Sequence, residues 1–396
     1  MRSRSLLRLD FLVIGGGPAG SACANQLARG GAHVAIVEGS DFSAFRIGET
    51  VDASAKPFLA SLGIPDLSEQ TWALPCSGIA TTWGAATGPQ PWLFDPYGRK
   101  WRVDRNLFDR ALFKQAQLAG AVAFPASTIT HLEIDPKGWA FTVQSERAVV
   151  KGSAEWVVAA TGRTQRSPGA SLHSRNSLDH LIGLATIGEI DSNCPAIDSK
   201  STALHLSATS GGWWYAVVTP SGRIVAVFFT DRDLIPHGKR ELRDFVGSQM
   251  EEATLPGWAT RTAEASLQTQ RLRGFNAESG VRKMGMSRNW IAIGDALVAM
   301  DPLCGMGIVS ALSSGVEAAD WLLQSSGYRS DSVQRRQWAE RVIERFNSYA
   351  SQRLAAYGQE RSYPSSRFWQ RRIEKATAYT TSHQVSRSSP TPTPGY

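Results

Sequence analysis

Cysteine is scarce in this sequence, and long apolar runs are missing. The four cysteines, Cys23, Cys76, Cys194 and Cys304, lie far apart and form no CxxC pair or metal-ligand spacing, so neither a disulfide framework nor a metal site is expected. No stretch approaches the roughly 20 apolar residues of a membrane span, and the N-terminus lacks the apolar core of a signal peptide. We therefore expect a cytoplasmic protein with free thiols and no membrane span.

Neither sign of charge dominates the composition. The chain has 42 Lys and Arg against 35 Asp and Glu, a formal net charge of +7. This charge does not cluster into a groove-binding helix or finger motif, so a nucleic-acid partner is not expected. With 396 residues, of which 42% are hydrophobic, the chain is long enough for two packed domains.

A short apolar run at 11–14 is followed at once by a glycine-rich turn. The pattern predicts a buried parallel strand that leads into a helix from Pro18 to about Arg29. A second apolar run, 34–37, stops at Glu38. Together these segments form a βαβ unit.

The turn has the spacing of a dinucleotide-binding fingerprint. Its members are Gly15, Gly17 and Gly20, with Pro18 and Ala19 between the last two. Small residues let the backbone approach a pyrophosphate, the helix N-terminus stabilises the negative charge, and Glu38 can accept hydrogen bonds from a ribose diol. The alternative is a tight turn that binds no ligand.

A second glycine turn decides between NAD and FAD, which share the first fingerprint. A strand at 290–293 leads into Gly294 and Asp295, and a later segment opens a helix. An Asp at a strand end can bind the hydroxyls of a ribityl chain, and a helix N-terminus can face the O2/N1 edge of a flavin. The pattern favours FAD. The alternative is an ordinary strand-turn-helix connection, which can have the same sequence pattern. The later segment comprises Asp301, Pro302, Gly305, Met306 and Gly307.

The middle of the chain has the sequence pattern of β-strands, and its end has the composition of helices followed by a disordered tail. Strands are expected at 203–206, 214–218 and 224–229, which indicates an antiparallel sheet inserted into the α/β domain. Residues 331–378 are rich in Arg, Gln, Glu and Ala and should be helical. The Ser, Thr and Pro of the last residues predict a disordered tail.

Taken together, the motifs resemble those of the flavin monooxygenase superfamily of the p-hydroxybenzoate hydroxylase type, which includes flavin-dependent halogenases and geranylgeranyl reductases. The resemblance implies an α/β fold with a Rossmann-like FAD-binding domain, an inserted antiparallel β-sheet substrate domain and a helical C-terminal segment. It also implies that Arg46 and Arg105 contact FAD and that Gly48–Thr50 lies beside the isoalloxazine. The motifs are GGGPAG (15–20), Glu38, RIGET (46–50), DRxxFD (104–109), Ala160-Thr161-Gly162 and GDAxxxxDPxxGxG (294–307).

The expected domains are discontinuous along the chain. They are an FAD-binding domain (1–75, 100–170 and 280–330), a substrate domain (76–99 and 171–279), a helical C-terminal segment (331–378) and a disordered tail (379–396). The cofactor-binding residues expected are Gly15, Gly17, Pro18, Ala19, Gly20, Glu38, Arg46, Arg105, Thr161, Gly162, Gly294, Asp295, Pro302, Gly305, Met306 and Gly307.

The stretch from Gly212 to Pro220 resembles the GWxWxIP strand of tryptophan halogenases, with Tyr215 at the second tryptophan. In that family the strand lies between flavin and substrate; the alternative for this strand is core packing. The tunnel lysine of those halogenases has no counterpart in 72–79, where the nearest lysine is Lys56. Their Glu-Ser-Thr segment is replaced here by Cys304, Gly305 and Met306. Halogenation is therefore not favoured, and oxygen transfer or a reductive reaction remains.

A more specific resemblance is to the flavoproteins that modify tryptophan during tryptophylquinone biogenesis. It implies an FAD-dependent monooxygenase that hydroxylates an aromatic substrate, a tryptophan side chain of a partner protein, through a flavin C4a-hydroperoxide. Such a reaction needs O2 and an external reductant, either NAD(P)H or a flavin reductase. The motifs are RIGET with Ala55-Lys56-Pro57, Thr82-Trp83-Gly84, Asp95-Pro96-Tyr97-Gly98, Trp101-x-x-Asp104-Arg105, Gly212-Trp213-Trp214-Tyr215 and Tyr363-Pro364 with 368–372.

The same resemblance supplies the remaining site residues. Trp83, Trp213, Trp214 and Tyr215 are expected on the substrate side. Glu49 and Asp52 are candidates for a general base, although a carboxylate at a loop start can equally be a helix cap.

Three other interpretations stay open. One is a flavin-dependent halogenase, and another is a reductase of a prenyl or lipid chain from the same superfamily. The third is a non-catalytic flavin-binding accessory protein that would use the Arg-rich segment Arg361–Arg372 as its contact surface, although such a charge run is more often a solvated face.

Overall fold

The computed structural model describes most of the chain. The described residues are 6–64, 66–84, 86–90 (backbone only), 99–136, 138–164, 175–190, 202–269, 271–282, 285–287, 289–324 and 332–374. The Asp95-Pro96-Tyr97-Gly98 motif, Cys194 and the tail 379–396 lie outside them.

The N-terminal part is built on an eight-stranded sheet, in which β19, β20, β11, β1, β2 and β8 follow one another and β10 joins β11 to β9. The central strand β1 pairs in parallel with both β2 and β11. The second half of β1, Phe11–Ile14, is buried and is a continuous apolar run, as expected of a strand covered on both faces, whereas Arg8 and Asp10 lie in its less buried first half. The strands are β1 (Leu7–Ile14), β2 (Val34–Val37), β8 (Val122–Phe124), β9 (Ser127–Asp135), β10 (Gly138–Ser145), β11 (Val149–Ala159), β19 (Met286–Ser287) and β20 (Trp290–Ala292).

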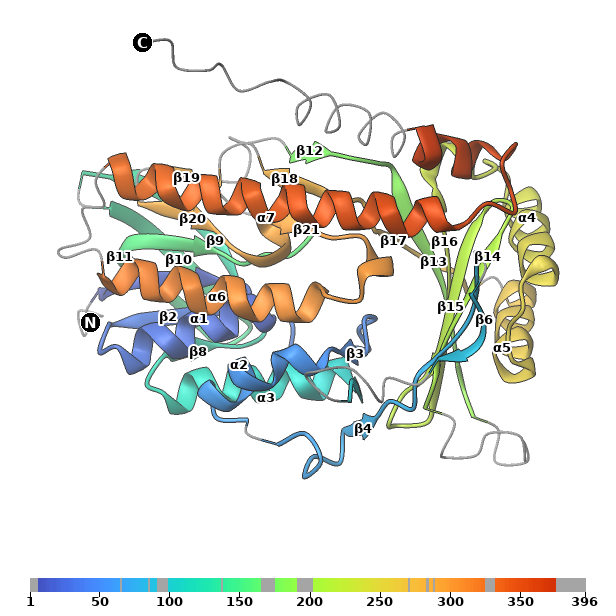
Figure 1. Cartoon of the computed structure of the whole chain (residues 1–396). Helices are drawn as coiled ribbons and strands as arrows, with labels where there is room; N and C mark the ends of the chain where they lie inside the picture. The colour runs from blue at the N-terminus through green and yellow to red at the C-terminus, as the bar shows by residue number, and fades with distance from the viewer. Residues whose placement is uncertain are drawn as a thin grey trace, which may run out of the picture.

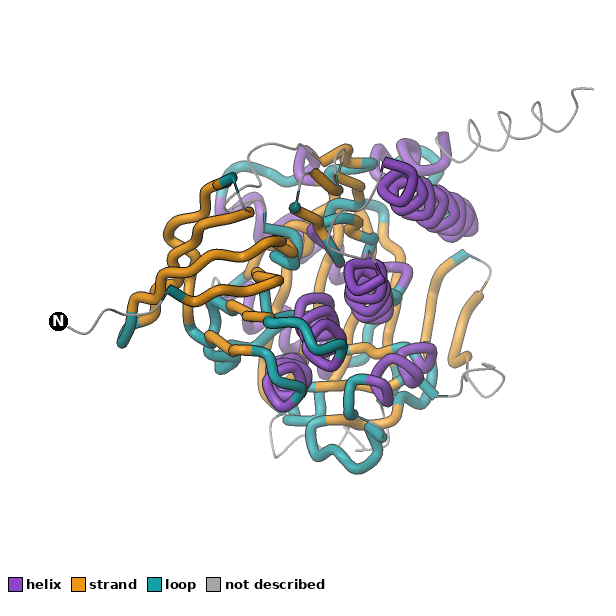
Figure 2. Tube along the Cα trace, turned by 90° about the vertical axis from the view of Figure 1, so that its left-hand side faces the viewer, coloured by secondary structure: helices purple, strands orange, loops and turns teal. Residues whose placement is uncertain are grey.

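Helices pack on one face of this sheet. Phe11 and Val13 of β1 contact a core that includes Cys23 of α1, Phe113 of α3 and Ala318 of α6, and Figure 2 shows helices end-on beside the strands. The opposite face packs against Trp139, Phe141 and Val143 of β10. The three helices are α1 (Pro18–Arg29), α3 (Arg105–Leu118) and α6 (Gly307–Gln324).

The second large sheet has seven strands in the order β17-β13-β16-β15-β14-β5-β6. Its pairs are antiparallel except β14 with β5. Helices α4 (Lys239–Glu252) and α5 (Gly257–Gln268) cover the outer face, as Figure 1 shows. The strands are β5 (Ile79–Trp83), β6 (Ala86–Gln90), β13 (Leu181–Glu189), β14 (Leu204–Thr209), β15 (Gly212–Val218), β16 (Arg223–Asp231) and β17 (Arg273–Asn276).

The C-terminal segment closes the inner face of the seven-stranded sheet. Helix α7 (Ser332–Gln359) runs along the molecule from the first sheet to the second (Figure 1), and a further helix follows at 367–374. Their side chains Tyr357, Phe368 and Trp369 are buried against Trp213 of β15. The C-terminal segment is therefore part of the core.

Short elements connect the two halves. Two three-stranded sheets have the orders β3-β7-β4 and β12-β18-β21. Their strands are β3 (Thr50–Val51), β4 (Ala73–Pro75), β7 (Trp101–Val103), β12 (Arg175–Ser177), β18 (Gly280–Arg282) and β21 (Val298–Ala299). The short helices are η1 (Ala53–Ala55), α2 (Lys56–Ser61), η3 (Arg232–Leu234), η4 (Gly294–Ala296) and η5 (Pro302–Cys304).

The expected fold class is confirmed, including the inserted antiparallel sheet and the helical C-terminal segment. Residues 360–366 interrupt the helix expected over 331–378, of which residues 331 and 375–378 lie outside the described part of the chain. Among the described residues, no helix is long and apolar enough to span a membrane.

Candidate functional site

In the first glycine turn, packing leaves no room for a side chain at Gly15 and Gly20, but it leaves room at Gly17. Gly15 has a φ of +110°, and a Cβ there would lie 2.3 Å from the carbonyl oxygen of Ala160. A Cβ on Gly20 would lie 1.9 Å from the carbonyl oxygen of Gly15. By contrast, a Cβ on Gly17 would meet no atom of the described residues within 4 Å. The open space at Gly17 fits the close approach of a ligand to the backbone.

The N-terminus of α1 begins at this open space. Gly17 is its N-cap residue, Pro18 follows, and no side chain of the described residues caps the helix. The N–H groups of a first helical turn need acceptors, and an anion supplies them. A diphosphate fits this position.

Glu38 lies beside the same turn. Its Oε2 accepts a hydrogen bond from the N–H of Gly16 over 2.7 Å, and its Oε1 accepts one from Arg46 over 2.8 Å. Burial opposes ionisation, but hydrogen bonds from Ser40 and Gly16 and the charge of Arg46 together lower the pKa of Glu38. Glu38 is thus a carboxylate that can accept further hydrogen bonds from hydroxyl groups.

The two arginines expected at the cofactor share one buried carboxylate. Asp109 of α3 accepts a hydrogen bond from Arg46 over 2.9 Å and two from Arg105, over 3.1 and 3.2 Å. Arg105 also donates to the carbonyl oxygens of Ile47 and Gly48. Asp109 therefore fixes the 46–48 segment against α3. It belongs to the 104–109 motif, but it was not among the site residues predicted from the sequence.

The second glycine turn meets the first. Gly294 has a φ of +56°, and a Cβ there would lie 2.7 Å from Cβ of Ala19 in α1. The expected residue Gly162, at a φ of +65°, follows Thr161, whose backbone N–H lies beside Gly15. Segments far apart in the sequence thus form one continuous surface around the start of α1.

Beyond Gly294, the expected residues lead to the start of α6. The carboxylate of Asp295 accepts a hydrogen bond from Arg163 over 3.1 Å, a partner that no sequence motif indicated. Gly305 has a φ of +64°, and in the part of the chain that the structure describes, Cβ atoms on Gly305 or Gly307 would meet nothing within 4 Å. The N-terminus of α6, like that of α1, faces open space. Pro302 and Met306 lie in the same 302–307 segment.

Two open helix N-termini and two acidic residues fit a dinucleotide. The Gly17 side can hold the diphosphate and Glu38 a ribose, while Asp295 and the start of α6 can hold a polyol and a ring edge. Among the described residues, no three His, Cys, Asp or Glu side chains are grouped as metal ligands.

Glu49, a candidate base, lies in an unusual environment. It directly precedes β3 and its side chain is only 1% exposed. The hydroxyl of Tyr215 donates a hydrogen bond to its Oε2 over 2.9 Å. Within the described part of the chain, Oε1 has no hydrogen-bond partner. Burial raises the pKa of Glu49, which makes its carboxylate a stronger base than that of an exposed glutamate.

Arg102 of β7 is a neighbour that sequence reasoning missed. It is fully buried and donates to Oγ1 of Thr50 over 2.7 Å. Its positive charge acts against the rise in the pKa of Glu49. Only the alternation Trp101-Arg102-Val103 in a short strand hints at an inward-facing charge.

Asp52, the second candidate base, is fully engaged. One carboxylate oxygen accepts hydrogen bonds from the N–H and the hydroxyl of Ser54 and so caps η1. The other pairs with Lys100 over 2.8 Å. The structure therefore shows the helix-cap alternative for Asp52, and we do not give it a catalytic role.

The aromatic residues of β15 lie on opposite faces. Trp213 and Tyr215 point to the inner face, against which Phe45, Ile47 and Leu303 also pack. Trp214 points to the outer face and is buried beneath α4 and α5. Core packing, the alternative considered above, describes Trp214.

Trp83 belongs to the inner cluster. Its ring lies 6.2 Å from that of Trp213 and 5.2 Å from that of Trp369, and its indole N–H donates to the carbonyl oxygen of Ala356. Of the four aromatic residues expected on the substrate side, Tyr215 is thus the one that contacts Glu49.

Comparisons with known sequences agree with this arrangement. Residues 10–100 match the family model described as tryptophan halogenase. LodB of Marinomonas mediterranea, named as an FAD-dependent oxidoreductase, is 28% identical over 379 residues, which cover 92% of this chain and 96% of LodB. Tryptophan 2-halogenase of Chondromyces crocatus is 32% identical over 187 residues, 45% of this chain and 35% of that enzyme.

Solved structures with the same fold include both halogenases and a hydroxylase. The myxobacterial chondrochloren halogenase CndH has a TM-score of 0.71 and 20% identity, with 96% of this chain and 90% of CndH covered. QhpG, a peptidyl tryptophan dihydroxylase essential for tryptophylquinone cofactor biogenesis, has a TM-score of 0.72 and 24% identity, with 92% and 79% covered.

Proposed function

Because the chain belongs to the superfamily of FAD-dependent halogenases and monooxygenases and has FAD as its cofactor, we propose that it is a monooxygenase acting on an aromatic substrate. The substrate that we propose is a tryptophan side chain of a partner protein. Reduced FAD, when bound, supplies the two electrons that activate O2. One oxygen atom enters the substrate as a hydroxyl group and the other leaves as water.

The observation that carries the proposal is the free oxygen of Glu49. When a ring carbon gains oxygen, the same carbon must lose its proton for the ring to become aromatic again. A general base with a raised pKa takes up that proton efficiently near neutral pH. Oε1 of Glu49 can accept it, while Tyr215 holds Oε2 in place.

The inner face of β15 supports this role. Tyr215 stacks on Phe229, with ring centroids 5.9 Å apart, and burial together with the Glu49 carboxylate raises the pKa of Tyr215 well above its ordinary value. Tyr215 therefore remains a neutral donor. Apolar neighbours at 45, 47 and 303 help to exclude water from the space between the 46–50 segment and the sheet.

Halogenation is the second candidate, and it is favoured by the family model and by the named relatives. Two observations speak against it. Lys56 is exposed, and Lys100 is engaged with Asp52, so neither is placed as the tunnel lysine of those enzymes. The carboxylate and hydroxyl of their Glu-Ser-Thr segment are absent at 304–306.

The proposal of a protein-borne tryptophan rests on two likenesses. The motifs resemble those of tryptophylquinone biogenesis flavoproteins, and QhpG shares the fold. An accessory role with the 361–372 segment as a contact surface is less well supported, because Arg371 and Arg372 are engaged internally with Asp231 and Asp233.

The test is a product analysis with labelled oxygen. The FAD-loaded protein is reduced with dithionite without air and then mixed with isotopically labelled O2, a set of tryptophan-containing peptides and bromide. We expect labelled oxygen on the indole and no bromine. Brominated indole would establish the halogenase alternative. Alkene reduction of a prenyl substrate without oxygen uptake would establish the reductase, and hydrogen peroxide as the sole product with every peptide would contradict a peptide substrate.

A further inference from the structure

Three side chains on one face of α7 converge on Asp301. Tyr349, Arg353 and Tyr357 are each four residues apart, which places them in a row along the helix. The N–H of Asp301 donates to the hydroxyl of Tyr349 over 2.5 Å. Oδ2 of Asp301 accepts hydrogen bonds from Nε of Arg353 and from the hydroxyl of Tyr357, both over 2.9 Å.

Asp301 holds the start of the segment that opens α6. It is completely buried, and its Oδ1 accepts a hydrogen bond from the N–H of Leu303 over 3.0 Å, which caps η5. Its position therefore sets where the 302–307 segment lies. A buried carboxylate with these partners is costly to move, because any unmet hydrogen bond in a buried site is penalised.

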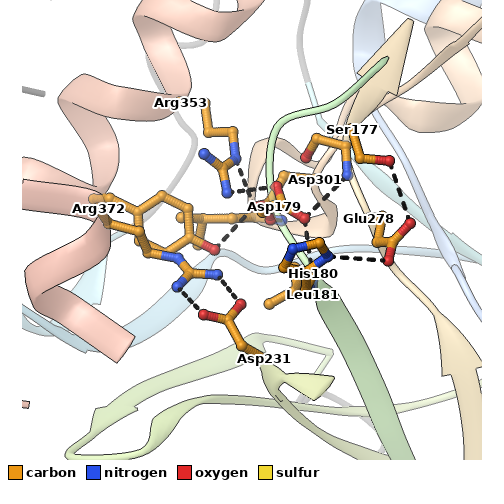
Figure 3. A network of polar contacts seen from close by, with 12 residues as sticks. Ser177, Asp179, His180, Leu181, Asp231, Glu278, Asp301, Arg353 and Arg372 are labelled. Carbon is orange, nitrogen blue, oxygen red and sulfur yellow. Dashed lines mark hydrogen bonds and ion pairs between the residues drawn. The ribbon is translucent and has the colours of Figure 1, made fainter. Parts of the chain in front are cut away.

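The same row on α7 reaches the seven-stranded sheet. The indole N–H of Trp213 in β15 donates to the hydroxyl of Tyr357 over 3.1 Å. Arg353 also donates to Asp179, just before β13, over 2.7 Å (Figure 3). Tyr357 thus accepts from the sheet and donates to Asp301 with a single hydroxyl group. Burial raises the pKa of Tyr357 far above its ordinary value, so the hydroxyl keeps its proton.

We propose that Tyr357 is a positioning residue that couples strand β15 to the 302–307 segment and thereby to the binding of FAD. The path has two hydrogen bonds, Trp213 to Tyr357 and Tyr357 to Asp301. A displacement of Trp213 changes the polarisation and the position of the Tyr357 hydroxyl group, and Asp301 responds because this hydroxyl donates a hydrogen bond to its Oδ2. Because thermodynamic linkage is reciprocal, FAD binding in turn stabilises one position of the Trp213 side chain on the inner face of β15. The inference rests on the assignment of the 302–307 segment to FAD.

Trp214 provides a matched control for Trp213. It is the next residue of the same strand and equally buried, but its indole N–H donates to the carbonyl oxygen of Gln249 on the outer face. Its replacement removes a buried indole of the same size without touching Tyr357 or Asp301.

The experiment is a double-mutant cycle on the Kd for FAD. Each apoprotein is titrated with FAD, and the visible circular dichroism of the bound flavin is recorded. The proteins are the wild type, the single variants Tyr357→Phe, Trp213→Phe and Trp214→Phe, and the two double variants that combine Tyr357→Phe with Trp213→Phe or with Trp214→Phe. We expect Tyr357→Phe to raise the Kd about fivefold or more and to alter the dichroism. Trp213→Phe should raise the Kd for FAD in the wild-type background. In a protein that already carries Tyr357→Phe, it should not raise the Kd further.

Trp214→Phe should leave the Kd unchanged in both backgrounds. Urea unfolding of each variant separates this coupling from a general loss of stability, which Trp213→Phe and Trp214→Phe would share. Unchanged Kd and dichroism in Tyr357→Phe, or additive effects of Trp213→Phe and Tyr357→Phe, would overturn the inference. Failure of the wild-type protein to take up FAD would instead overturn the cofactor assignment beneath it.

Discussion

The hydroxyl of Tyr215 donates a hydrogen bond to Oε2 of Glu49 over 2.9 Å and so joins the middle of β15 to the residue that precedes β3. This contact links the two halves of the molecule at the point where we propose that the substrate binds. The other oxygen of Glu49 is buried and has no hydrogen-bond partner among the described residues.

Glu49→Gln should abolish most of the proposed hydroxylation while FAD remains bound. An amide cannot take up the proton, and general-base catalysis is commonly worth about 100- to 10,000-fold in rate. Product formation with labelled O2 and FAD content measure the two effects. A variant that retains full turnover would show that Glu49 is not the base.

The same substitution should change the pH dependence of stability. The pKa of Glu49 is raised on folding, so its contribution to stability is present at acidic pH and is lost as pH rises through the folded-state pKa. Glu49→Gln has no such group. Urea unfolding at acidic and at neutral pH should show that the variant gains stability relative to the wild type as pH rises; a constant difference would contradict the prediction.

Tyr215→Phe should shift the pH–rate profile. The hydrogen bond from Tyr215 lowers the pKa of Glu49 against the larger effect of burial, so its loss raises that pKa further. If Glu49 acts as a carboxylate, the acidic limb of the profile moves to higher pH, and kcat falls more than KM changes. An unshifted limb would mean that the titrating group lies elsewhere.

Gly17→Val should prevent FAD binding without unfolding the protein. A Cβ on Gly17 meets no described atom within 4 Å, and the φ of −72° is open to any residue. The added branches would occupy the space that a diphosphate needs. We expect cooperative unfolding in urea close to that of the wild-type apoprotein, with no bound flavin after purification. Gly20→Ala is the contrasting variant, since its Cβ collides with the backbone at Gly15 and should impair folding itself.

Arg372→Met should destabilise the protein by about 3 kcal/mol, because it leaves Asp231 as a poorly compensated buried charge. Arg371→Met is the matched control. Its side chain is 33% exposed against 4% for Arg372. It pairs at 2.6 Å with the exposed Asp233 and only at 3.2 Å with Asp231, so we expect its loss to cost about 0 to 1 kcal/mol, as for exposed pairs. The free energies of unfolding in urea measure both, and equal losses would contradict the distinction.

Local patterns predicted the parts of the fold that depend on neighbours in sequence. The helix from Pro18 to Arg29 and the strand at 34–37 were predicted with the bounds that the structure gives, because a glycine turn, a proline at the helix start and an apolar run act locally. The 15–20 and 294–307 turns were both predicted to bind FAD because they resemble the motifs of the flavin monooxygenase superfamily. The close approach of Gly294 to Ala19 shows how the two turns lie next to each other.

Partners brought together by tertiary packing could not be predicted in this way. The period of two along β15 separates Trp213 from Trp214, but only the packing of α4 and α5 shows which face is the outer one. Likewise, nothing in the 301–307 motif indicates that Asp301 is bound by Arg353 and Tyr357, since α7 lies far along the chain.

The closure of the inner cluster by Tyr357, Phe368 and Trp369 has a consequence for biosynthesis. Trp83 and Trp213 leave the ribosome long before the side chains that cover them. The growing polypeptide therefore carries a large uncovered aromatic surface until synthesis is nearly complete, and such surfaces attract chaperones and favour aggregation. We expect ribosome-bound chains that stop before α7 to be sensitive to protease across the second sheet, and full-length released chains to be resistant.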